Sequence, residues 1–430
     1  MKRRELLKMM AMSASSVGMP LLAKPLFAQS SQYTGPLFLT LQVSGAWDVS
    51  SFCDPKTNIS GAPEINRWSQ TAGIQQAGNI PYAPFGNNNA LFEKYHRDML
   101  IINGVDTQTN AHSVGILHNW SGRNAVGYPS LPALFSATYA PNLPLSYINF
   151  GGYANSAGLV RYSRLNGIDN LGELLIPNVA DIDKSKSYRN VSDMEKISAL
   201  QQQRLDRLSN NETLLPRQRN NAAAYAAALN NGADLETFAN TLLGVDSFQE
   251  EVEVGGTGSS DLLTQIQLSV LAFSAGVACS GDLYVKGFDT HNDHDQDHEP
   301  RLAHLADAID YLWTYAEERG VADRLTLMIA SDFARTPYYN STDGKDHWPI
   351  GSVICMKKEA SWGNRVVGST DSAQAALALN PSTLVQDNNG VIIQPGHIHK
   401  ALRTELGLDG AGLAFPFELT DDLDIFNPAL

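Results

Sequence analysis

The chain has 430 residues, of which 43% are hydrophobic and 18% are charged, and its formal net charge is −14 at neutral pH. A chain of this length can bury a large core, and its acidic surface as a whole repels nucleic acid and anionic membranes, so we expect neither as a partner. An anionic substrate therefore needs a local cation, which a bound metal would supply. The three cysteines lie far apart in the sequence, which excludes a disulfide framework and a cysteine-based metal site.

The N-terminus is typical of an export signal. Arg3 and Arg4 precede a short, weakly apolar segment over residues 9–22, and Ala28 offers a cleavage point. This arrangement resembles a twin-arginine signal, and the alternative is an uncleaved N-terminal anchor. We therefore predict a signal over residues 1–28, export to the periplasm with the twin-arginine translocase as partner, and no membrane span after cleavage. The signal holds five basic residues and one acidic residue, so its removal changes the formal net charge from −14 to −18.

Apolar runs predict six buried strands, over residues 36–43, 98–105, 143–150, 282–288, 325–330 and 350–356. Helical patterns between them cover residues 114–122, 262–277 and 300–319. This alternation predicts a single α/β domain over residues 29–430, built on a doubly wound, mostly parallel sheet. A polar helical segment at about 190–245 is predicted to be an insertion in that domain or a lid over its sheet.

Carboxylates, imidazoles and a serine lie beside the ends of the predicted strands. They are Asp48, Ser113, Asp289, His291 and Asp332, which follow strands, and His347, which precedes one. The loops after parallel strands share one edge of a sheet, so we expect these side chains to meet there. Asp and His side chains at this density are typical ligands of divalent metals.

Each of these residues also has a simpler interpretation when it is taken alone. Asp48 would then be a turn residue and Ser113 a helix cap, although a hydroxyl at a helix N-terminus is also suited to nucleophilic attack. The polar run over residues 292–298, which includes His294 and His298, fits either further metal ligands or a solvated loop. Two carboxylates of a carbohydrate-active enzyme are a further alternative, with no distinguishing sequence context.

Three sequence blocks together carry a resemblance to a known family. They are Gly-Phe-Asp-Thr-His at 287–291, Ser-Asp-Phe-Ala-Arg-Thr-Pro at 331–337 and Gly-Lys-Asp-His-Trp at 344–348, supported by Ser-Gly-Ala-Trp-Asp at 44–48 and Ala-His-Ser at 111–113. With these blocks the chain resembles the exported, sulfatase-like proteins grouped as domain of unknown function 1501, in the alkaline phosphatase superfamily. The resemblance covers most of residues 36–410 and implies an alkaline-phosphatase-like fold.

The resemblance implies a periplasmic, metal-dependent hydrolase of phosphate or sulfate esters, with an anionic ester as substrate. It assigns Ser113 as nucleophile beside His112, Arg335 as a contact to an ester oxygen, and a metal to a group of five ligands: Asp48, Asp289, His291, Asp332 and His347. The metal would be Zn, Mn, Mg or Ca, and a site without metal stays open.

The sequence also departs from the pattern of this superfamily. Phe333 follows Asp332 where well-studied members carry a histidine ligand, and His294 is nearer than His291 to the usual spacing from Asp289. No Cys-x-Pro-Ser-Arg block is present, which excludes a sulfatase that uses formylglycine. The alternative function is therefore a non-catalytic binding or assembly protein on a degenerate hydrolase fold.

Overall fold

The structure is a computed structural model, and the part of it described below is residues 32–430 without 166–170, 172–177, 182–185, 257, 413, 418, 420, 428 and 430. The predicted signal over residues 1–28 lies outside the described residues. Among the described residues, no helix has the length and apolar character needed to cross a membrane.

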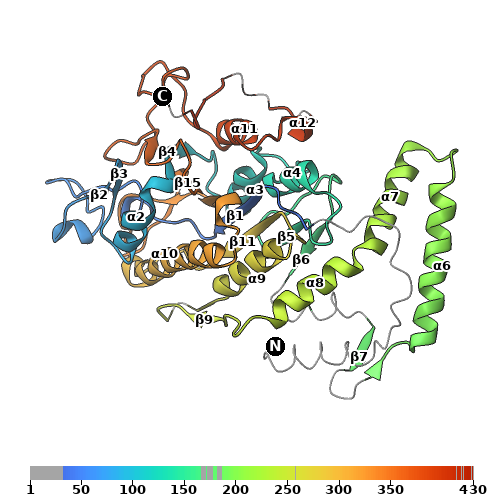
Figure 1. Cartoon of the computed structure of the whole chain (residues 1–430). Helices are drawn as coiled ribbons and strands as arrows, with labels where there is room; N and C mark the ends of the chain where they lie inside the picture. Colours follow the sequence, from blue (N-terminus) through green and yellow to red (C-terminus); the bar gives the residue numbers. More distant parts are fainter. Residues whose placement is uncertain are drawn as a thin grey trace.

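The centre of the molecule is an eight-stranded sheet (Figure 1). Its strands, in spatial order, are β16 (Arg365–Val367), β4 (Met99–Asp106), β15 (Ile350–Lys357), β12 (Leu325–Ser331), β1 (Leu37–Val43), β11 (Ser280–Val285), β5 (Tyr147–Asn149) and β6 (Tyr162–Arg164). All neighbouring pairs are parallel except the two that β15 makes, with β12 and with β4. The predicted α/β class and mostly parallel sheet are therefore confirmed.

Strand β15 runs against the other strands, and this reversal matters for the site. The carboxyl ends of β1, β4, β11 and β12 meet at one edge of the sheet, and the amino end of β15 lies at that same edge. His347, three residues before β15, is therefore brought to the edge where the other candidate residues leave their strands.

Helices cover both faces of the sheet, as the doubly wound prediction requires (Figure 1). One face carries α2 (Asn88–Tyr95), α9 (Leu262–Ser274) and α10 (His294–Glu318), and the other carries α3 (His112–Ser121), α4 (Leu131–Tyr139), α11 (Pro395–Glu405) and the short α12 (Asp409–Gly412). The strands β1 and β12 are buried along their whole length, which explains why they read as unbroken apolar runs in the sequence.

Three helices fill the segment that was predicted to be an insertion or a lid. They are α6 (Val191–Ser209), α7 (Pro216–Asn230) and α8 (Gly232–Leu243). The hairpin of α6 and α7 projects away from the sheet instead of covering it, while α8 returns to the body and packs on α9 (Figure 1). The lid interpretation is therefore wrong for the hairpin.

Candidate metal centre

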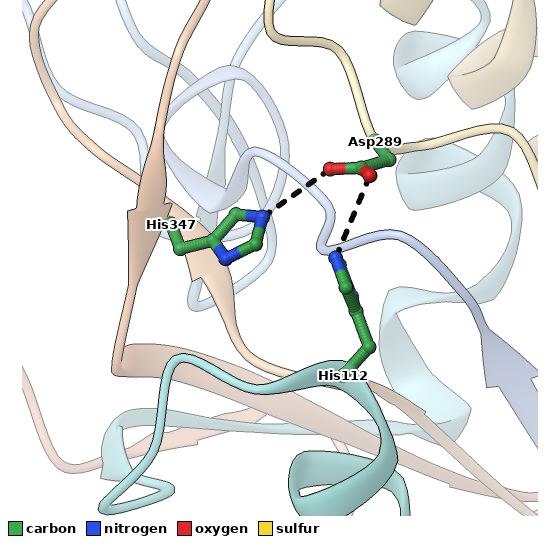
Figure 2. A group of neighbouring side chains, drawn as sticks. All are labelled: His112, Asp289 and His347. Atoms are coloured by element: carbon green, nitrogen blue, oxygen red, sulfur yellow. Dashed lines mark hydrogen bonds and ion pairs between the residues drawn. The ribbon is translucent and has the colours of Figure 1, made fainter.

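The candidate site is formed at the edge where β4, β11 and β12 end. His112 is the first residue of α3, which follows β4, while Asp289 and His291 lie in the loop after β11. His347 comes from the two-residue strand β14 (His347–Trp348), which pairs with β13 (Ala334–Arg335) after β12. Figure 2 shows Asp289 between His112 and His347, which approach it from different elements.

Close backbone packing holds these elements together. Gly45 has a φ of +111°, and a Cβ there would lie 2.4 Å from the backbone nitrogen of Asp289. Gly115 in α3 lies against the backbone carbonyl of Asp332, to which a Cβ would come within 2.1 Å. The glycines therefore let the loop after β1 and the start of α3 approach the loops that carry the site.

Asp332 sets the orientation of the His112 ring. Its carboxylate is fully buried and lies 2.5 Å from His112 Nδ1, and it also accepts hydrogen bonds from Gln42 Nε2 at 2.5 Å and from the Gly45 amide at 3.0 Å. The hydrogen bond from His112 to Asp332 raises the pKa of His112 above its ordinary value. Asp332 thus lies behind His112, not beside Asp289, and the structure does not place it among the ligands as predicted.

The other two histidine rings are held in the same way. His347 Nδ1 donates to the carbonyl oxygen of Asn110 at 2.8 Å, and His291 Nδ1 lies 3.0 Å from the carboxylate of Asp346. Both of these partners are acceptors, so in the neutral rings the proton lies on Nδ1 and Nε2 carries a lone pair. The hydrogen bond from His291 lowers the pKa of Asp346.

All three Nε2 atoms converge on Asp289. His291 Nε2 and His347 Nε2 lie 3.1 and 3.3 Å from Asp289 Oδ1, and His112 Nε2 lies 3.5 Å from Asp289 Oδ2. The ligand atoms of His112, Asp289 and His347 all lie within 4.8 Å of one another. The predicted joining of Asp289, His291 and His347 is thus seen, and His112 joins them through Nε2.

This arrangement fits a bound metal ion. His291 Nε2 and His347 Nε2 face each other at 3.0 Å, where two lone pairs repel unless a cation or a proton lies between them. His112 Nε2 is buried and has no hydrogen-bond partner among the described residues. A carboxylate or carbonyl on the far side of each ring is the pattern that surrounds histidine metal ligands in proteins.

Arg335 neutralises Asp289 from the protein side. The guanidinium is fully buried and contacts Asp289 Oδ1, and it donates to the carbonyl oxygens of Gly45, Ala46 and Lys345. Burial alone would raise the pKa of Asp289, but the Arg335 hydrogen bond and charge outweigh it and lower that pKa. Arg335 is thus engaged by the protein itself, and the structure does not present it to an ester oxygen as expected.

Asp48 belongs to a separate, closed network. Its carboxylate is buried and accepts hydrogen bonds from the side chains of Ser50 at 2.7 Å, Ser51 at 2.9 Å and Lys345 at 2.8 Å, while His294 Nε2 lies 3.2 Å away. Burial acts to raise the pKa of Asp48, but the Lys345 ammonium and His294 hold it well below its usual range. The lysine thus supplies the cation beside Asp48, which the structure does not bring to Asp289.

The histidines of the polar run 292–298 join the same network. His294 and His298 lie on the first two turns of α10, are buried, and stack with ring centroids 4.4 Å apart. They therefore form neither a solvated loop nor part of the ligand group around Asp289.

Ser113 is exposed as the second residue of α3, directly after His112. It does not cap the helix, because Ala111 holds that position. None of the described contacts joins its hydroxyl to the four converging side chains.

Phe333 has a packing role where a further ligand was considered. Its buried ring contacts both His112 and His347, with centroid distances of 4.9 and 4.7 Å. It therefore fixes two of the histidine rings laterally, while their Nδ1 partners fix them along the ring plane.

Several residues of the site were not found from the sequence. Gln42 donates a hydrogen bond to Asp332 and accepts one from Trp120 Nε1 at 2.5 Å. Asp346 accepts a hydrogen bond from His291 Nδ1. Gln42 had a usable signal, because an amide inside a buried apolar strand needs polar partners. Asp346 directly precedes His347 in the block at 344–348, and this position beside a predicted ligand could have indicated that Asp346 belongs to the site.

Comparison with family models decides the family. The model described as protein of unknown function (DUF1501) matches residues 41–407. The chain belongs to the DUF1501 family. A comparison of this DUF1501 chain with curated proteins gives no match.

Solved structures that match this chain include a sulfatase and an alkaline phosphatase. A sulfatase from a Pseudoalteromonas species is 12% identical and has a TM-score of 0.40, with 97% of this chain and 73% of that chain covered. The alkaline phosphatase from the Antarctic bacterium TAB5 is 12% identical and has a TM-score of 0.35, with 77% of this chain and 94% of that chain covered.

Proposed function

We propose that this protein is an exported, metal-dependent hydrolase of phosphate or sulfate esters. The observation that carries the proposal is the convergence of three histidine Nε2 atoms on Asp289, each ring being held at Nδ1 by an oxygen acceptor. The choice of ester rests on the resemblance in the sequence blocks around these residues. The signal-like N-terminus supports a place of action in the periplasm.

The ligand set favours a first-row transition metal or zinc. Three imidazole nitrogens and one carboxylate suit Zn, Mn, Fe or Co, whereas Mg and Ca prefer sites made of oxygen ligands. Of the four metals considered from the sequence, Zn and Mn are therefore the proposed ones. When bound, such a metal polarises an ester oxygen as a Lewis acid.

The protein side chains have separate tasks in this proposal. Asp332, Asp346 and the Asn110 carbonyl keep the three Nε2 lone pairs directed at one point, and Arg335 compensates the charge of Asp289. The Asp289 side chain is 50% exposed, so the centre is open to a substrate from solvent. The acidic chain repels anions in general, which leaves the bound cation to attract an anionic ester.

Ser113 is the proposed nucleophile. It follows His112 in the first turn of α3, where backbone amides without helical partners and the helix dipole stabilise an alkoxide or an ester oxygen. Its exposure leaves the hydroxyl accessible to a substrate.

The test is turnover of aryl phosphates and aryl sulfates by the mature protein after loading with Zn or Mn. We expect activity that a chelator removes, and a loss of at least ~100-fold in kcat for His112→Ala and for Ser113→Ala. His96→Ala, which changes a half-buried histidine away from the site, is the matched control and should keep full activity. Metal binding without turnover in the wild type would instead support the alternative of a binding protein.

A further inference from the structure

The hairpin formed by α6 and α7 has very little core of its own. Leu205 is the one buried side chain on α6, and α6 makes its principal contacts with α7. In proteins most of the stability of a helix comes from packing its apolar face, so the hairpin gains from a partner. Four large apolar side chains in and beside it are exposed: Tyr188, Val191, Leu200 and Leu215, with exposed fractions of 50% to 68%.

The charge of this region is opposite to that of the remaining chain. Residues 186–231, which we call the arm, hold seven basic and four acidic residues, a net charge of +3 within a chain of −14. All seven basic side chains are exposed: Lys186, Arg189, Lys196, Arg204, Arg207, Arg217 and Arg219. Within the described part of the chain, no salt bridge joins any of these five arginines to a carboxylate.

In the segment that follows the arm, every residue with a charged side chain is acidic, if histidine is left aside. Residues 232–285 contain eight acidic residues and no lysine or arginine. Five of the acids are exposed around the short strands β9 (Val252–Glu253) and β10 (Ser259–Ser260): Asp246, Glu250, Glu251, Glu253 and Asp261. We call these five residues the acidic patch.

The arm and the acidic patch lie at opposite ends of one stretch of the molecule. From the projecting hairpin of α6 and α7, the chain returns through α8 towards β9 (Figure 1). A twofold axis between two antiparallel stretches would place each arm on the acidic patch of the other copy, and both contacts would be the same. The exposed apolar side chains favour a protein surface as the partner over nucleic acid, which would leave them uncovered.

We propose that the arm is a self-association surface by which two copies of this chain form a twofold dimer, with the arm of each copy on the acidic patch of the other. Attraction between oppositely charged surfaces raises the association rate and fixes the orientation, while the apolar side chains add buried area. Because the charged groups are exposed, the dimer weakens as salt screens them.

A charge exchange in the mature full chain tests this proposal. The arm variant carries Arg204→Glu and Arg207→Glu, the patch variant carries Glu250→Lys and Glu251→Lys, and the control variant carries Lys94→Glu and Arg97→Glu on the body. The mass in solution is measured by sedimentation at about 0.05 M and about 0.5 M salt, between which the screening length falls several-fold.

We expect a dimer for the wild type and the control at low salt, a weaker dimer at high salt, and monomers for the arm and patch variants. An equimolar mixture of the arm and patch variants should form the dimer again, which also shows that both variants are folded. A monomeric wild type, or a dimer that both variants keep, would overturn the proposal. So would a monomeric wild type that sediments with vesicles of anionic phospholipid, because the arm would then bind a membrane surface.

Discussion

At the scale of single residues, Asp332 acts on the proposed metal centre through the His112 ring. Its buried carboxylate accepts three hydrogen bonds, from His112, Gln42 and the Gly45 amide. An asparagine has one acceptor oxygen in place of two and adds an NH2 donor, so it cannot accept all three. The His112 ring would then lose the partner that keeps its Nε2 lone pair directed at Asp289.

We therefore predict that Asp332→Asn weakens binding of Zn by roughly 10- to 100-fold, the range found for partners behind metal ligands. Titration calorimetry on the purified protein measures the change. Asp282→Asn is the matched control, because Asp282 also has a buried carboxylate but contacts Thr40, Tyr147 and Asn149. Equal losses in both variants would show that Asp332 acts only through general stability.

The sequence predicted which residues reach the site better than it predicted what each does there. Asp289, His291 and His347 were found because each lies beside a strand end on the shared edge. The placement of Asp48 and Asp332 could not be resolved in the same way, since a strand end fixes the backbone and not the partner of the side chain. Asp48 is bound by Lys345, almost 300 residues away in the sequence, and no local pattern indicates that pairing.

At the level of elements, the orientation of α3 decides where His112 lies, and α11 braces α3. His399 on α11 donates from Nε2 to the carbonyl oxygen of Asn119 on α3 at 2.6 Å. Its Nδ1 is buried with no hydrogen-bond partner among the described residues, so a second proton would find no acceptor. Burial, with Arg403 nearby, lowers the pKa of His399 to about 3.

This contact makes the packing of α3 and α11 sensitive to acid. The folded protein keeps His399 neutral, whereas the unfolded chain takes up a proton near pH 6.5, so the stabilisation is complete above that pH and is lost as the pH falls towards 3. His399→Gln keeps a donor for the Asn119 carbonyl but does not titrate. We therefore expect this variant to take up about one proton fewer on unfolding in acid, which lowers the slope of the unfolding free energy with pH. The change in slope is about 1.4 kcal/mol per pH unit.

Denaturant unfolding of the wild type and of His399→Gln between pH 4 and pH 8 measures that slope. Parallel stability curves for the two proteins would contradict the assignment. Other buried histidines, His118, His294 and His298, also have lowered pKa values through burial, so the variant should still lose some stability in acid.

Element prediction succeeded where hydrophobic periodicity is strong and failed where tertiary contacts decide. The buried strands β1, β4, β12 and β15 follow their apolar runs closely. Helix α10 begins at His294, six residues before the predicted start at Pro300. The extra turns are held by tertiary contacts, because the His294 ring contacts Asp48 and Thr290, and Tyr339 donates a hydrogen bond to Asp295. The reversal of β15 was not predicted, since a buried apolar run has no direction.

On the scale of the whole molecule, the proposed metal centre and the proposed self-association surface lie in different places. The proposed metal centre lies at one edge of the sheet, and Asp332, Phe333 and Arg335 pack behind its side chains. The arm projects from another part of the body, and its net charge is positive whereas that of the remaining chain is negative (Figure 1). Loss of the arm contact should therefore change the assembly without changing metal binding.

The central claim is that His112, Asp289, His291 and His347 bind a metal ion together. Elemental analysis of the purified mature protein after Zn loading and gel filtration tests it most directly, with His112→Ala and His96→Ala treated in parallel. The account predicts about one Zn per chain in the wild type and in His96→Ala, and substantially less in His112→Ala. A wild type without bound metal, or His112→Ala with the same metal content as the wild type, would contradict it.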